Sequence, residues 1–127
     1  MKMVGDPKVK LKGAIKDLRK LSDIIAVGIV RRDGLIIAHD LPGGVDPRRI
    51  AAMTAAIVGT SEMAAQELEQ GEFSQTVIEC DQGKIVSCGA GEEALLVTLV
   101  EKDANLGLVL IQMERTAKRV EEILKAL

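Results

Sequence analysis

The residues of this chain that could do chemistry are few, and they lack the partners that a reaction needs. The only Gly-Lys pair, Gly83-Lys84, is followed by Ile85, so the hydroxyl residue that completes a phosphate-binding loop is missing. His39 is the only histidine, which excludes a multi-histidine metal site, and we expect it to be a strand-end residue without a chemical role. We therefore predict no catalytic residue, no metal ligand and no cofactor, and we do not expect an enzyme.

The segment Gly89-Ala90-Gly91 has the small residues of a loop whose backbone amides could hold an anion. The next two residues, Glu92 and Glu93, would repel a phosphate, and no helix is predicted to start there. We interpret the segment as a turn that joins two strands.

Cys80 and Cys88 flank a turn predicted at residues 81–83, which places Cys80 opposite Lys84 and Cys88 opposite Thr76. An offset of four residues separates the two thiols by roughly 13 Å along a strand, beyond the reach of a disulfide. Two cysteines also fall short of a structural zinc site. We expect both cysteines to be reduced.

Arg48 and Arg49 lie in the first turn of a predicted long helix. Arginine supplied by a partner protein can stabilise the charge that develops during GTP hydrolysis. Two solvated arginines near a helix start are the simpler alternative, and the sequence leaves both open.

Length and composition indicate a single domain spanning residues 1–127. The chain is 47% hydrophobic and 28% charged, as expected of a globular protein. Its longest apolar run is shorter than the ~20 residues that a membrane-spanning helix needs. Residues 1–10 have no apolar segment typical of a secretory signal. We expect a cytoplasmic protein without a transmembrane segment.

Aromatic residues and charge argue against a nucleic-acid partner. Phe73 is the only aromatic residue, so stacking of bases on aromatic rings is not available, and the net charge is −2. The charge is unevenly placed: residues 1–20 have seven basic and two acidic residues, whereas residues 62–103 have two basic and ten acidic ones. Such a distribution could steer a charged partner, or it could reflect a solvated helix face.

Two Asp-Pro pairs, Asp6-Pro7 and Asp46-Pro47, have the capping residue and the first-turn proline that start helices. The apolar period changes between and after them from helical to alternating and back. The predicted elements are a helix from 7 to 21, strands at 24–31 and 35–39, a helix of about 24 residues at 46–70, strands at 73–80, 84–89 and 94–101, and a helix from 105 onward. Gly71 is the expected left-handed residue that ends the long helix.

The long helix is apolar on two sides, so it must be buried on two sides. The stripe expected to face the sheet comprises Ile50, Met53, Ile57, Ala64 and Leu68. A second stripe of mostly small residues comprises Ala52, Ala55, Ala56, Gly59 and Met63, and we predict that it packs against another copy of the chain. A contact with another helix of the same chain is the alternative.

Strand 73–80 is the most polar of the predicted strands, as expected of a sheet edge. An edge strand has unpaired backbone groups that must be covered or paired. We therefore predict that this strand, through residues that include Phe73, Gln75 and Val77, joins the sheets of two copies.

The element order, with Gly28, the turn Asp33-Gly34, the strand 35–38 and the junction 103–108 (Asp-Ala-Asn-Leu-Gly-Leu), resembles the roadblock/dynein light-chain family over residues 11–124. The resemblance implies an α/β fold in which a five-stranded antiparallel sheet has one long helix on one face and two helices on the other. It also implies dimers in which long helices pack together and edge strands join. The family implies non-catalytic scaffolds and regulators of small Ras-like GTPases, among them bacterial GTPase-activating partners and subunits of dynein and lysosomal signalling complexes.

These observations together predict a non-catalytic dimeric scaffold that binds a small Ras-like GTPase and could modulate its nucleotide cycle. The second subunit is expected to be the chain itself or a paralogous roadblock protein. The candidate contact residues for the GTPase are Arg48, Arg49, Glu62, Gln66 and Glu69. Two alternatives remain: an assembly subunit that uses its basic first helix on a membrane or nucleic acid, and a module that binds a ligand in a groove between sheet and helix.

Overall fold

The structure, a computed structural model, describes residues 5–127. Its elements in chain order are α1 (Pro7–Leu18), β1 (Ile24–Arg31), β2 (Ile36–Asp40), α2 (Pro47–Glu67), β3 (Gln75–Glu79), β4 (Gly83–Ala90), β5 (Ala94–Glu101) and α3 (Leu106–Lys125). The predicted order of helices and strands is confirmed.

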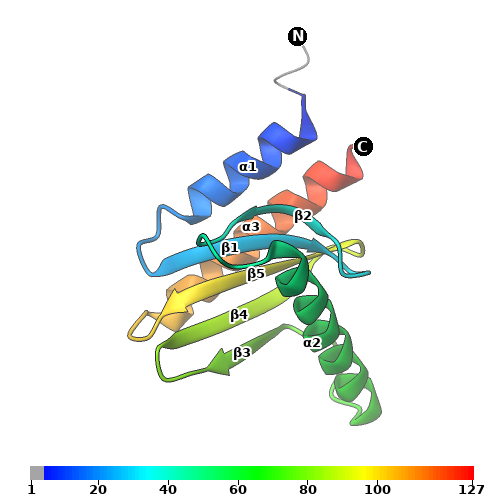
Figure 1. The fold of residues 1–127 in the computed structure, drawn as a ribbon. Helices are drawn as coiled ribbons and strands as arrows, with labels where there is room; N and C mark the ends of the chain where they lie inside the picture. Colours follow the sequence, from blue (N-terminus) through cyan, green and yellow to red (C-terminus); the bar gives the residue numbers. More distant parts are fainter. Residues whose placement is uncertain (1–4) are drawn as a thin grey trace.

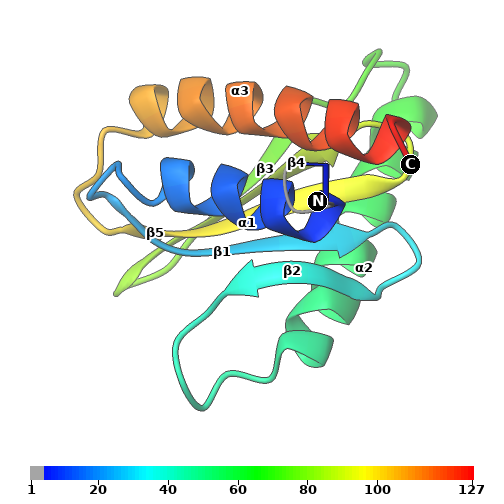
Figure 2. The same ribbon diagram turned by 90° about the horizontal axis from the view of Figure 1, so that it is seen from above.

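The five strands form one antiparallel sheet in the order β2-β1-β5-β4-β3. Helices α1 and α3 lie side by side on one face of this sheet, and α2 covers the other face (Figures 1 and 2). This arrangement confirms the predicted fold class. The most apolar strand, β5, lies in the middle, and the polar strand β3 lies at an edge, as expected.

Each helix begins at a residue whose side chain accepts a hydrogen bond from the first turn. Asp6 accepts from the Lys8 amide at 2.9 Å, and Asn105 accepts from the Leu108 amide at 3.2 Å. Asp46 caps α2 through the Arg48 amide at 3.0 Å. The two Asp-Pro helix starts are therefore confirmed.

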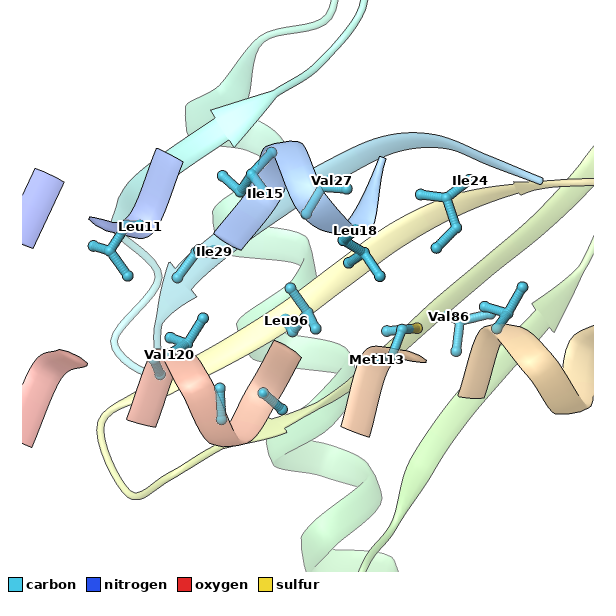
Figure 3. Close-up of a cluster of buried hydrophobic side chains, with 14 of the residues drawn as sticks. Leu11, Ile15, Leu18, Ile24, Val27, Ile29, Val86, Leu96, Met113 and Val120 are labelled. Atoms are coloured by element: carbon cyan, nitrogen blue, oxygen red, sulfur yellow. The ribbon is translucent and has the colours of Figure 1, made fainter. Parts of the chain in front are cut away.

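The sheet has a separate hydrophobic core on each face. The core between the sheet and helices α1 and α3 contains fifteen buried residues, among them Leu18, Leu96 and Met113 (Figure 3). The core under α2 contains five: Val30, Ala51, Val58, Leu95 and Val97. Strand β1 supplies residues to both cores, as expected of a strand that is apolar on both faces.

The end of the long helix differs from the prediction. Helix α2 ends at Glu67, and Glu69 takes the left-handed conformation with φ of 53°. The Glu69 amide donates to the Gln66 carbonyl at 3.0 Å, and the Gln70 amide donates to the Ala65 carbonyl at 2.9 Å. These two bonds form a Schellman motif that ends the helix before Gly71 is reached. Gly71 has the expected positive φ, at 89°, but it lies beyond the end of the helix, so the expectation that it terminates α2 was wrong.

The predicted register of the β3–β4 hairpin was wrong by one residue. The Cys80 amide donates to the Gly83 carbonyl at 2.9 Å, so the connecting turn has two residues rather than three. Cys88 consequently pairs with Gln75 instead of Thr76. Both cysteines are free, as predicted.

Candidate protein-interaction face

Helix α2 contacts the sheet through small side chains. Its buried residues are Ala51, Thr54 and Val58. The stripe predicted to face the sheet is therefore wrong in part: Ile50 and Ile57 are half-buried, but Met53 is 52% exposed, and Ala64 and Leu68 are also exposed. The small residues at 51 and 54 bring the helix backbone close to the strands, which turns the larger Met53 outward.

The second predicted stripe of α2 faces mostly outward. Ala52, Ala56 and Met63 are exposed, whereas Ala55 and Gly59 are half-buried. We call the exposed apolar residues of this helix the α2 face: Ala52, Met53, Ala56, Met63 and Ala64. Met63 is 70% exposed. A helix with this much apolar side-chain surface in water is expected to have a binding partner.

Gly59 lies inside α2, where glycine costs roughly 1 kcal/mol of helix stability relative to alanine. A Cβ atom built on Gly59 would meet no atom of this chain within 4 Å. Nothing in the described part of the protomer therefore requires glycine at this position. A close approach by another molecule would require it.

Strand β3 adds an unpaired backbone edge next to the α2 face. Because the Cys80 amide donates toward β4, the alternation of an antiparallel ladder turns the amides of Gln75 and Val77 away from the sheet. The side chain of Val77 is partly exposed, at 36%. Phe73 precedes the strand and packs, half-buried, against the core under α2.

An apolar hollow of about 160 Å³ lies at the start of α2, between this helix, the sheet and the loop after β2. Its walls include Leu41, Val45, Ile50, Ile85 and Val97. The hollow shows that α2 does not cover the whole of the sheet face on which it packs.

The predicted partner residues fall into two groups. Arg48, Arg49, Gln66 and Glu69 are exposed at the two ends of α2. The hydrogen bond from the Arg48 amide holds the pKa of the capping residue Asp46 below its usual value.

Glu62 belongs to the second group because its carboxylate is engaged within the chain. Arg32 donates to both carboxylate oxygens of Glu62, at 2.8 and 3.0 Å, and to the Gly91 carbonyl at 3.2 Å. This contact joins α2 to the β1–β2 and β4–β5 turns. Sequence reasoning missed it because the two charged residues are thirty positions apart and no local pattern links them.

A second concave region, of about 550 Å³, lies between α3 and strands β3 and β4. It is a groove between sheet and helix, the kind of site named above as an alternative ligand-binding site. Its walls include Gln75, Cys88, Leu110, Met113 and Lys118. Burial raises the pKa of the Cys88 thiol to about 11, with a smaller contribution from Glu114. The thiol is therefore protonated at neutral pH and is a poor nucleophile.

Two further features of residues 5–127 bear on the chemistry of this chain. In this range, no three histidine, cysteine, aspartate or glutamate residues are placed to hold a metal ion together. None of the helices in the same range has the length and apolar content to cross a membrane.

Comparisons with known proteins agree with this architecture. The model of the Roadblock/LC7 domain matches residues 11–100. Protein MJ1340 of Methanocaldococcus jannaschii is 40% identical over 105 residues, which cover 83% of this chain and 91% of that protein.

Two solved structures have the same fold. The gliding protein MglB of Thermus thermophilus superposes with a TM-score of 0.85 at 20% identity, covering 95% of this chain and 93% of MglB. A structure of MglB with a tetrameric arrangement gives a TM-score of 0.86 at 22% identity, with the same coverage of 95% and 93%. The family match, the close relative and the shared fold together establish that this chain belongs to the Roadblock/LC7 domain family.

Proposed function

We propose that this protein is a non-catalytic dimeric platform that binds a small Ras-like GTPase. The observation that carries the proposal is the α2 face, an exposed apolar helix surface with an unexplained glycine beside an open strand edge. The family resemblance supports the choice of a GTPase as partner. Acting as a scaffold requires surfaces of this kind and no reactive group.

In the proposed dimer, the α2 faces of two copies pack together and their β3 edges pair in antiparallel fashion. Two identical edges that pair in this way are related by a twofold axis perpendicular to the sheet. The result is one continuous sheet of ten strands, with both copies of α2 on the same side. The tetrameric arrangement of MglB is a precedent for self-assembly by this fold.

Gly59→Leu tests the helix contact. The substitution has room within the protomer and raises the helix propensity of α2, so the fold should be kept or stabilised. In a close helix contact, the added side chain should cost roughly 1 to 3 kcal/mol by overpacking. Light scattering should show a dimer for the wild type, a weaker dimer for Gly59→Ala and a monomer for Gly59→Leu. A wild-type monomer at tens of micromolar, where a typical micromolar dimer would form, would exclude the contact.

Proline substitutions test the strand contact. Val77→Pro removes an amide that points away from the sheet, so the protomer should fold while the dimer is weakened. Ile78→Pro is the matched control, because the amide of Ile78 points toward β4 and its loss should destabilise the protomer itself. Slow hydrogen exchange at the Gln75 and Val77 amides in the wild-type dimer is expected. Fast exchange there would place the interface elsewhere.

The GTPase contact is tested by titrating the purified protein against each small GTPase of its own cell, in the GDP and GTP-analogue states. Binding should depend on the nucleotide, because the γ-phosphate and its magnesium ion order the switch segments of such GTPases. Arg48→Glu with Arg49→Glu should weaken this binding without dissociating the dimer. Acidic residues in the first turn interact favourably with the helix dipole, so the helix itself should remain stable.

The effect on the nucleotide cycle is measured by the GTP hydrolysis rate of the bound GTPase, with and without this chain. Failure to bind any GTPase, with the dimer intact, would leave an assembly subunit as the better description. Nucleotide turnover by this chain alone that survives repurification would overturn the non-catalytic assignment. Copurification with a paralogous roadblock protein would replace the homodimer by a heterodimer.

A further inference from the structure

Charge is segregated between the layer of helices α1 and α3 and the rest of the chain. The helical layer of residues 6–20 and 105–127, which contains α1 and α3, has ten basic and five acidic residues, a net charge of +5. Residues 21–104, which contain α2 and the whole sheet, have six basic and fourteen acidic residues, a net charge of −8. The overall charge of −2 is therefore the sum of a basic helical layer and an acidic remainder.

The basic charge of this layer is concentrated on α1 and is not neutralised there. Lys8, Lys10, Lys12 and Lys16 are exposed, and none of them forms an ion pair within residues 5–127. We call these four lysines the α1 lysine face. Lys8, Lys12 and Lys16 recur every four residues, which places their charges along one side of the helix at intervals of roughly 6 Å.

Two neighbouring carboxylates, Asp17 and Asp40, are already paired with other cations. Asp17 accepts from Arg119 at 2.7 Å and lies 3.2 Å from Lys20, and these contacts lower its pKa. Asp40 accepts from Arg19 at 2.6 Å. Within residues 5–127 no carboxylate forms an ion pair with the α1 lysine face, so its charge remains available to an external anion.

The shape of this side selects among anionic partners. Helix α1 lies beside α3 on the sheet, so the two helices form a broad layer rather than one protruding helix (Figure 2). A helix that reads DNA must enter a groove about 12 Å wide, and single-stranded nucleic acid is usually held by stacking on aromatic rings. Phe73, the only aromatic residue, packs on the opposite side of the sheet. An extended anionic surface fits the broad layer best.

We propose that the α1 lysine face binds the surface of a membrane that contains anionic lipids. Each lysine near the surface of an anionic membrane raises the affinity of a protein for that membrane about fivefold. Val9, which is 46% exposed among these lysines, can enter the interface between headgroups and acyl chains. In the proposed dimer both α1 lysine faces lie on the same side of the joined sheet, which adds the attraction of a second copy, although each protomer has the surface by itself.

The test is cosedimentation of the full-length protein with vesicles of phosphatidylcholine and phosphatidylglycerol, compared with vesicles of phosphatidylcholine alone. Binding should require phosphatidylglycerol and should disappear at about 1 M salt, where the screening length falls to roughly 3 Å. The double substitution Lys12→Gln and Lys16→Gln should weaken binding roughly 30-fold.

The matched control is Lys84→Gln with Lys102→Gln, which removes the same charge from the other part of the molecule and should leave vesicle binding unchanged. Circular dichroism checks that all variants fold. No binding to the acidic vesicles, equal binding to both kinds of vesicle, or equal losses in the two double variants would overturn the proposal. Tighter binding to duplex DNA through the same lysines would replace the membrane by nucleic acid.

Discussion

The contact between Arg32 and Glu62 should contribute measurably to the stability of the fold. Arg32 donates twice to the carboxylate, and the two side chains are only 33% and 34% exposed. The Arg32 Nε atom is buried and has no hydrogen-bond partner in the described chain. Removing the carboxylate would therefore leave a partly desolvated guanidinium held only by the Gly91 carbonyl.

The free energy that the Arg32–Glu62 contact contributes to folding is expected to lie between two limits. Exposed ion pairs contribute roughly 0.2 to 1 kcal/mol, and hydrogen bonds to charged groups contribute about 1.5 to 3 kcal/mol. For a pair that is two-thirds buried we expect a coupling free energy of about 1.5 kcal/mol. For a domain of this length, that corresponds to a fall in melting temperature of roughly 5 °C.

A double-mutant cycle with Arg32→Met and Glu62→Gln isolates the coupling from the other effects of each substitution. Thermal and urea unfolding should be measured at one fixed protein concentration, because dimerisation would make stability depend on concentration. The adjacent pair Arg31 and Asp33 is the control, since its side chains are 54% and 52% exposed although its atoms are only 2.6 Å apart.

The control cycle should give no more than about 0.5 kcal/mol. A coupling at Arg31 and Asp33 equal to that at Arg32 and Glu62 would refute the reasoning, because burial would then not decide the contribution. So would a coupling near zero at Arg32 and Glu62.

Three further predictions concern single residues. Glu69→Gly should stabilise the protein by roughly 1 kcal/mol, because glycine adopts the left-handed φ of 53° without strain; unchanged unfolding would show that this cap is not strained. Gly83→Ala should destabilise it by roughly 1 to 3 kcal/mol, because the added Cβ would lie 2.8 Å from the Val100 carbonyl oxygen; a wild-type melting curve would contradict this. At neutral pH iodoacetamide should modify the exposed Cys80 well before Cys88, whose reaction should accelerate only as the pH rises toward its pKa of about 11. Mass spectrometry after timed quenching measures both rates, and equal rates at neutral pH would contradict the assignment.

Features that depend on neighbouring residues could be predicted from the sequence. The caps Asp6 and Asp46 are local, and so is the apolar run that forms β5, whose bounds Ala94–Glu101 match the prediction. The end of α2 was missed because Glu69 adopts a conformation that its residue type disfavours, and the helix closes there through backbone hydrogen bonds.

The spacing of apolar residues also failed to predict which side of α2 faces the sheet. A rule that buries the largest apolar residues turns Met53 inward, whereas the close approach of helix and sheet is made by Ala51 and Thr54. In the candidate site, Ala52, Ala56 and Met63 are exposed in the protomer, so their predicted contact with a second copy stays a prediction, and the engagement of Glu62 by Arg32 was not foreseen. That ion pair depends on the meeting of two turns and a helix that are distant in the chain.

The unequal size of the two cores has a consequence for the order in which the molecule opens. Helices α1 and α3 share fifteen buried residues with the sheet, whereas α2 is held by a cluster of five. Local unfolding proceeds first where the fewest apolar contacts must be broken, so α2 should detach in excursions that leave the rest of the sheet folded. A subunit that covers the α2 face would suppress those excursions, and association would then act as the last step of folding.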